Sequence, residues 1–163
     1  MKHLFLLILL VFPVGMLYGQ NKGNCSSNSI DSVHVRFESL YEDFLDVSFV
    51  SDKHTLSLFK TEITPSPNKL IYRTNNYDTI DYLFSRIRII MNNPPIWDSN
   101  IVIYDCCPSI TISSYCQGNV WKQTYVLYAE AYFPFAYAEL YSLIRYYIVK
   151  YVKKDWDGCW QVK

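Results

Sequence analysis

Neither sign of charge dominates this chain of 163 residues, because 15 lysines and arginines balance 15 aspartates and glutamates. The balance provides no basic surface field, so we expect no nucleic-acid partner. Charged residues make up only 18% of the chain and apolar residues 50%, which excludes an intrinsically disordered protein. Glycine and proline, with 5 and 7 residues, are too few for a fibrous or low-complexity chain. The composition therefore predicts a folded globular protein.

The sequence also lacks the short motifs of the common enzyme chemistries. It contains no nucleophile elbow, zinc-protease helix, phosphate loop or dinucleotide fingerprint. Its cysteines form no Cys-x-x-Cys pair, and beyond the N-terminal region only His34 and His54 could act as imidazole ligands or bases. We therefore assign no catalytic residue and expect no metal site and no cofactor.

Acidic residues gather in one segment, at Glu38, Glu42, Asp43 and Asp46. A pair of these carboxylates could serve glycoside hydrolysis. The apolar residues between them equally fit a short amphipathic helix whose acidic face is solvated. We favour the solvated helix, because runs of charge are usually solvent-facing.

The N-terminal residues have the layout of a secretory signal peptide. Lys2 precedes an uninterrupted apolar run from Leu4 to Phe12, and Gly19 offers a small residue for cleavage. The run is shorter than the about 20 residues that span a bilayer. We expect removal of residues 1–19, a secreted or periplasmic protein, and no transmembrane span after cleavage. The alternative is an uncleaved N-terminal anchor.

The remaining sequence divides into a leader and one domain. Residues 20–30 are polar and contain glycine and serine, which predicts a flexible leader. Residues 31–163 are long enough for a single globular domain with its own core.

Hydrophobic periodicity predicts the elements of that domain. Helical spacing of apolar residues indicates helices at about 78–92, with Asp78 as the N-cap, and at about 134–154. Gln117-Gly118-Asn119 is typical of a hairpin turn. Alternation and short apolar runs indicate strands around residues 33–37, 47–49, 56–58, 101–104, 110–112 and 121–128.

This order of elements predicts an α+β fold. We expect an antiparallel sheet of about five to six strands packed by the two helices. The alternative is a small β-barrel with a packed helix.

Five cysteines remain after the predicted cleavage, so at least one lacks a partner within the chain. An exported protein can form disulfides. Adjacent Cys106 and Cys107 are poorly placed to bond to each other, but either could reach a distant cysteine. The disulfide candidates are Cys106, Cys107, Cys116 and Cys159.

Aromatic residues are abundant, with 15 tyrosines, 9 phenylalanines and 4 tryptophans. Such rings fill cores, but tyrosine and tryptophan also suit recognition surfaces. The candidate binding residues are those that fall off an apolar helix face or beside a turn, namely Tyr146, Trp97, Trp156 and Trp160. We therefore expect a non-catalytic binding module whose partner is an envelope or secreted protein. The alternatives are an envelope hydrolase or a carbohydrate-binding protein without a recognisable motif.

Overall fold

The structure is a computed structural model that describes residues 21–22, 25–39, 45–61, 68–94, 108–126 and 135–156. A short 3₁₀ helix covers Ser27–Ser29. The other described elements are β1 (Asn21–Lys22), β2 (Ser32–Ser39), β3 (Leu45–Asp52), β4 (Leu56–Thr61), β5 (Lys69–Thr74), α1 (Tyr77–Asn92), β6 (Ser109–Cys116), β7 (Asn119–Val126) and α2 (Phe135–Tyr151).

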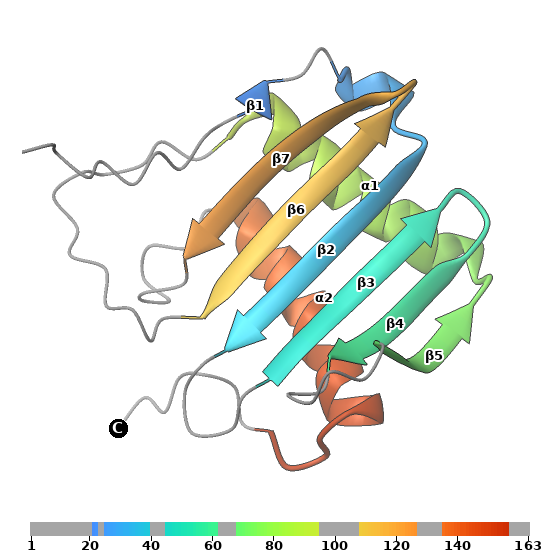
Figure 1. Cartoon of the computed structure of the whole chain (residues 1–163), viewed down its shortest axis with the longest axis vertical. Coiled ribbons are helices and arrows are strands. Elements are labelled where there is room, and N and C mark those ends of the chain that lie inside the picture. The colour runs from blue at the N-terminus through green and yellow to red at the C-terminus, as the bar shows by residue number, and fades with distance from the viewer. Residues whose placement is uncertain are drawn as a thin grey trace, which may run out of the picture.

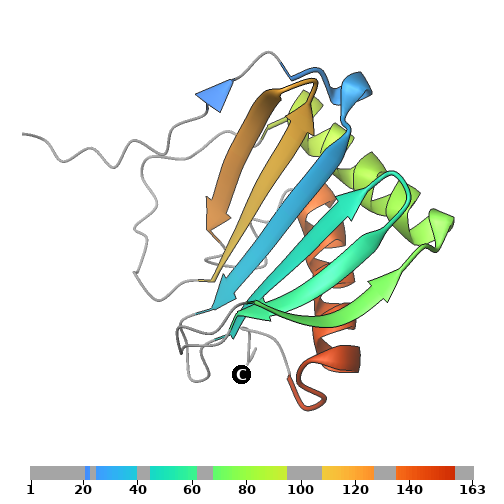
Figure 2. The same ribbon diagram turned by 45° about the vertical axis from the view of Figure 1, so that its right-hand side comes forward.

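The strands form one antiparallel sheet in the order β1-β7-β6-β2-β3-β4-β5. Both helices lie on the same side of this sheet (Figures 1 and 2). The predicted α+β fold with two helices is therefore confirmed. The alternative of a β-barrel is wrong, because the sheet is open, with β1 and β5 at its two edges.

The central strand β2 shows why the sheet has two different faces. Val33, Val35 and Phe37 are fully buried beneath the helices, whereas His34 and Arg36 alternate with them on the other face. Successive side chains of a strand point to opposite faces, so this alternation orients the whole strand. We call the side of the sheet that carries His34 and Arg36 the outer face.

Helix α1 begins earlier than the sequence indicates, and its N-cap is Asn76 instead of Asp78. The Asn76 side-chain oxygen accepts a hydrogen bond from the Thr79 backbone N–H at 2.9 Å. Asp78 lies inside the first turn, where its charge complements the helix dipole. The buried face of α1 follows the predicted helical spacing, with Ile80, Leu83, Phe84, Ile87 and Ile90.

Helix α2 packs beside α1 on the sheet. Arg86 of α1 forms an ion pair with Glu139 of α2, which joins the two helices through their half-buried side chains. Neither described helix combines the length and the apolar character needed to cross a membrane. The buried residues of α2 are Tyr137, Leu140, Tyr141, Ile144, Tyr147 and Ile148.

The hairpin between β6 and β7 confirms the predicted turn. Gln117 and Gly118 have φ angles of 46° and 84°, and Cys116 pairs with Asn119 on either side of them. Two consecutive positive φ angles are the signature of a type I′ turn, whose twist matches the flanking strands. Glycine adopts this conformation without steric cost.

The segment predicted as a flexible leader is attached to the domain through β1, which pairs with β7, and again from Cys25 onward. A disulfide joins Cys25 to Cys116 at the end of β6, and Ile30 is buried in the core. The polar composition of this segment did not indicate the attachment, because it depends on individual side chains. Cys25 contributes a covalent bond and Ile30 contributes apolar packing. The predicted signal peptide and the predicted strand at residues 101–104 lie outside the described residues.

Candidate binding surface

The sequence-derived binding residues do not form one group in the structure. Tyr146 lies on α2 with 54% of its surface exposed. Trp97 and Trp160 lie outside the described residues. Tyr146 is therefore the accessible member of the set within the described chain.

Trp156 has a different position from Tyr146. It follows α2 and lies half-buried against the core. Its ring packs edge-on against Phe37 at 5.6 Å and against Tyr141 at 6.4 Å between ring centroids. These contacts identify Trp156 as a packing residue at the margin of the core.

Tyr146 belongs to a cluster that the sequence did not indicate. We name Tyr72, Tyr146, Tyr147, Tyr151 and Lys150 the tyrosine–lysine surface. The Tyr72 and Tyr151 rings stack at 4.2 Å between centroids with planes 18° apart. The Tyr147 ring lies 5.8 Å from that of Tyr151 and 5.3 Å from that of Tyr146. The cluster thus joins the edge strand β5 to the last turns of α2.

Polar contacts fix the outer part of this surface. The Lys150 ammonium donates a hydrogen bond to the Tyr146 hydroxyl at 2.8 Å. This bond and a second one with Tyr151 raise the pKa of Lys150, so its positive charge persists through neutral pH. Hydrogen bonds with Thr74 and Tyr151 lower the pKa of Tyr72. Phenol hydroxyl groups and one ammonium group therefore line the solvent side of the cluster.

The inner part of the surface is anchored in the core. Tyr147 is buried, and its ring lies edge-on to Phe49 at 5.7 Å. Burial raises the pKa of the Tyr147 hydroxyl. Because Tyr147 contacts Tyr72, Tyr146 and Tyr151, one buried ring positions three accessible ones. These contacts connect the surface to the core.

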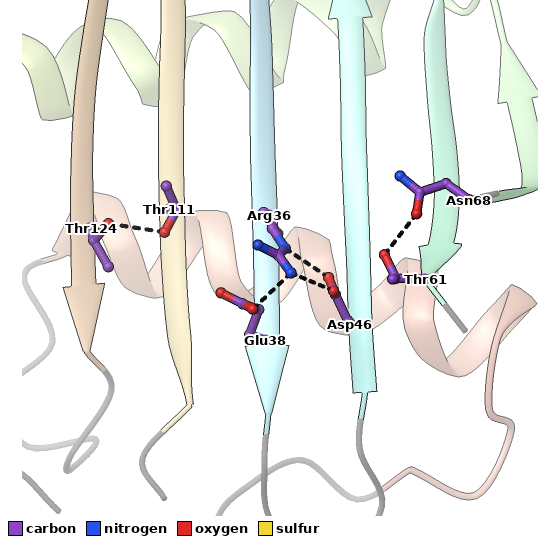
Figure 3. Close-up of polar contacts among 7 residues, drawn as sticks. All are labelled: Arg36, Glu38, Asp46, Thr61, Asn68, Thr111 and Thr124. Atoms are coloured by element: carbon purple, nitrogen blue, oxygen red, sulfur yellow. Dashed lines mark hydrogen bonds and ion pairs between the residues drawn. The ribbon is translucent and has the colours of Figure 1, made fainter. Parts of the chain in front are cut away.

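The outer face of the sheet carries a band of polar cross-strand contacts (Figure 3). Arg36 on β2 donates two hydrogen bonds to Asp46 on β3, at 3.0 and 2.6 Å, and forms an ion pair with Glu38 at 2.9 Å. The Asp46 side chain is only 1% exposed. On both sides of this network, paired side chains continue the band, with 2.9 Å between Thr111 and Thr124 and 3.1 Å between Thr61 and Asn68.

These contacts correct the interpretation of the acidic segment. Glu38 and Asp46 belong to paired strands and face each other across the β2–β3 pair, so they do not lie on a solvated helix. Leu45 and Asp46 already belong to β3, where both are buried. Glu42 and Asp43 lie outside the described residues. Two carboxylates bound to one guanidinium form a structural network, in which both acidic side chains are already engaged with Arg36.

His34 also faces the outer side of the sheet. Its Nε2 atom is buried, and no described group forms a hydrogen bond with it. Burial lowers the pKa of His34, and the positive charges of Arg36 and Lys122 lower it further against the opposing effect of Asp46. In the described chain, no three histidine, cysteine or acidic side chains gather as metal ligands.

The disulfide partner of Cys116 is Cys25, with 5.2 Å between their Cα atoms. Cys116 was one of four candidates, whereas Cys25 was placed in the leader. Cys106, Cys107 and Cys159 lie outside the described residues. No sequence signal could have identified the pair, because the two cysteines are 91 residues apart.

Comparison with protein-family models, with curated proteins and with solved structures gave no match to this chain.

Proposed function

We propose that this chain is an exported, non-catalytic binding protein that contacts a protein partner through the tyrosine–lysine surface. The observation that carries the proposal is the exposed Tyr146 ring, which contacts Lys150 and the buried ring of Tyr147. Tyrosine supplies a large contact area with a polar tip and loses little conformational entropy on binding. A surface already ordered in the free protein lowers the entropic cost of association.

The stacking supports a protein partner over a carbohydrate. A sugar commonly lies flat against the face of an aromatic ring. Here one face of Tyr72 and one face of Tyr151 are turned toward each other, with 4.2 Å between the ring centroids. The hydroxyl groups and the ammonium beside these rings suit the mixed apolar and polar contacts of a protein interface.

Two features support export. The N-terminal sequence has the layout of a signal peptide. The Cys25–Cys116 disulfide fits the oxidising compartments outside the cytosol.

Crosslinking capture from the native envelope and secreted fractions tests the proposal. Wild-type protein should capture a defined protein, and Tyr146→Ala should lose it. Tyr115→Ala is the matched control, because Tyr115 is also exposed but lies on β6, away from the surface. Equal capture by the Tyr146→Ala and Tyr115→Ala variants would reject the proposed role of the tyrosine–lysine surface in binding. Turnover of an ester, glycoside or peptide substrate by the purified protein would reject the non-catalytic function.

A further inference from the structure

We infer that the partner presents an acidic, extended segment that lies along β5 and meets the lysines around the tyrosine–lysine surface. This inference rests on the proposed function and adds the chemistry of the partner. It follows from where the strand register places Lys60 and Lys69, and from which cations at this corner of the sheet form no ion pair.

Lys60 and Lys69 are directly opposite each other on β4 and β5. Lys60 is also opposite Val47, which is fully buried beneath the helices, so this lysine pair is on the helix side of the sheet. Like charges placed directly opposite each other destabilise a sheet. An anionic ligand between the two ammonium groups would relieve that repulsion.

The lysine pair is next to the tyrosine–lysine surface. Leu58 lies two residues before Lys60 on β4 and is opposite Tyr72 on β5. The Tyr72 ring stacks on Tyr151 of α2. Two residues of an extended strand span about 7 Å. The lysine pair and the stacked tyrosines are therefore successive positions on one side of the sheet edge.

The end of α2 adds further cations to this corner. Lys150 is exposed, and Lys154 is exposed three residues after the helix ends, next to Asp155 in the sequence. In the described part of the chain, Lys60, Lys69, Lys150 and Lys154 form no ion pair. Positive charge at this corner is therefore available to a partner.

The position of β5 explains why the segment is expected to be extended. β5 is the last strand in the sheet order, so one of its edges has no strand partner in the described chain. An open edge can accept an extended segment of another protein as an added strand. A second copy of β5 is poorly suited, because Lys69–Thr74 contains Lys69 and Arg73 and no acidic residue. An acidic segment complements the same charges.

Lysines on an edge strand also prevent aggregation between sheet edges. If protection were their sole role, removing their charge would promote self-association and leave the binding of an acidic peptide unchanged. The two roles therefore predict different measurements.

The test uses two fluorescent ten-residue peptides, one alternating glutamate with threonine and one alternating glutamine with threonine. Fluorescence anisotropy should show saturable binding of the glutamate peptide alone. The Lys60→Gln/Lys69→Gln variant should raise the dissociation constant roughly fivefold, while Lys122→Gln on β7 changes it less than about twofold. Raising the salt from about 0.05 M to about 0.5 M should weaken binding by wild-type protein. Circular dichroism and sedimentation check that the variants fold and keep the assembly state of the wild-type protein.

Three outcomes would overturn the inference. The first is no saturable binding of the glutamate peptide, and the second is an equal effect of the β4–β5 and β7 variants. The third is tighter binding of a sulfated polysaccharide or an oligonucleotide at the same lysines, which would assign the site to another polyanion. The same variants in the capture experiment separate the two proposals. If capture needs Tyr146 but is insensitive to the lysines and to salt, the proposed function stands and the acidic partner is rejected.

Discussion

Arg36 is the residue on which the polar contacts of the outer face converge. Its guanidinium binds Asp46 and Glu38, and through Asp46 it joins β2 to β3. The two partners differ in exposure, since 43% of the Arg36 side chain is exposed but only 1% of that of Asp46. Removing Arg36 would therefore leave a buried carboxylate without its counter-charge, which is the costly way to break an ion pair.

We predict that Arg36→Gln lowers the free energy of unfolding by about 1–2 kcal/mol, at the lower end of the range for buried pairs because solvent screens the exposed arginine. Urea denaturation measures the loss. Lys122→Gln, which removes an exposed charge from the same face, should stay within about 0.5 kcal/mol of wild type. Equal values for the two variants would contradict the structural role of Arg36.

His34 makes stability depend on pH. Burial and the nearby cations lower its pKa below the ordinary value of 6.5. Between the folded and the unfolded pKa, the unfolded chain binds more protons, so acid shifts the equilibrium toward unfolding. The contribution of His34 is complete above about pH 6.5 and is lost as the pH falls toward its folded-state pKa.

We therefore predict that the free energy of unfolding decreases between about pH 7.5 and pH 5, and decreases less in His34→Gln. Urea denaturation at a series of pH values measures both slopes. His54→Gln, which removes a histidine from the exposed turn after β3, is the matched control. A wild-type slope in His34→Gln would assign the acid sensitivity to other groups.

At the scale of elements, the local sequence predicts the strands and helices in which the spacing of apolar residues repeats without interruption. The alternation of Val33, Val35 and Phe37 identified β2, and the helical spacing of apolar residues identified both helices. β5 was missed because the β4–β5 register shifts between Leu58 and Phe59, and because its consecutive half-buried residues do not alternate. An irregular edge strand has no two-residue period to detect.

Helix α1 provides a test at the same scale. We predict that Asn76→Ala costs about 1 kcal/mol of stability, because the Thr79 N–H loses its acceptor. Asp78→Asn should cost less, about 0.5 kcal/mol, because it removes only an interaction with the helix dipole. Thermal or urea denaturation of the two variants gives the order. A larger loss in Asp78→Asn would restore Asp78 as the cap.

At the scale of the whole molecule, the Cys25–Cys116 disulfide limits the unfolded chain. It closes a loop between residues 91 positions apart. We predict that the double variant Cys25→Ser/Cys116→Ser loses about 2–4 kcal/mol of stability, chiefly because its unfolded ensemble is larger. Denaturation of both proteins without reductant measures the loss, and the intact mass of wild type verifies the bond. An unchanged transition would show that the bond does not constrain unfolding.

The candidate site depends on the same long-range geometry, which explains why the sequence indicated only part of it. Tyr146 could be singled out because helical spacing places it off the apolar face. Tyr72 could not, because its contact with Tyr151 arises only when β5 and the end of α2 meet. The position of Trp156 at the margin of the core likewise depends on a long-range contact, with Phe37 on β2.

The order of strands also separates the two margins of the molecule. Asn21 pairs with Lys122 at the β1 edge, whereas Tyr72 lies on β5 at the opposite edge, six strand spacings or about 29 Å away. The sheet therefore acts as a rigid spacer between the point where the chain joins the domain and the surface proposed to meet the partner. A tag or anchor joined to the chain ahead of Asn21 would therefore start at the sheet edge opposite that surface.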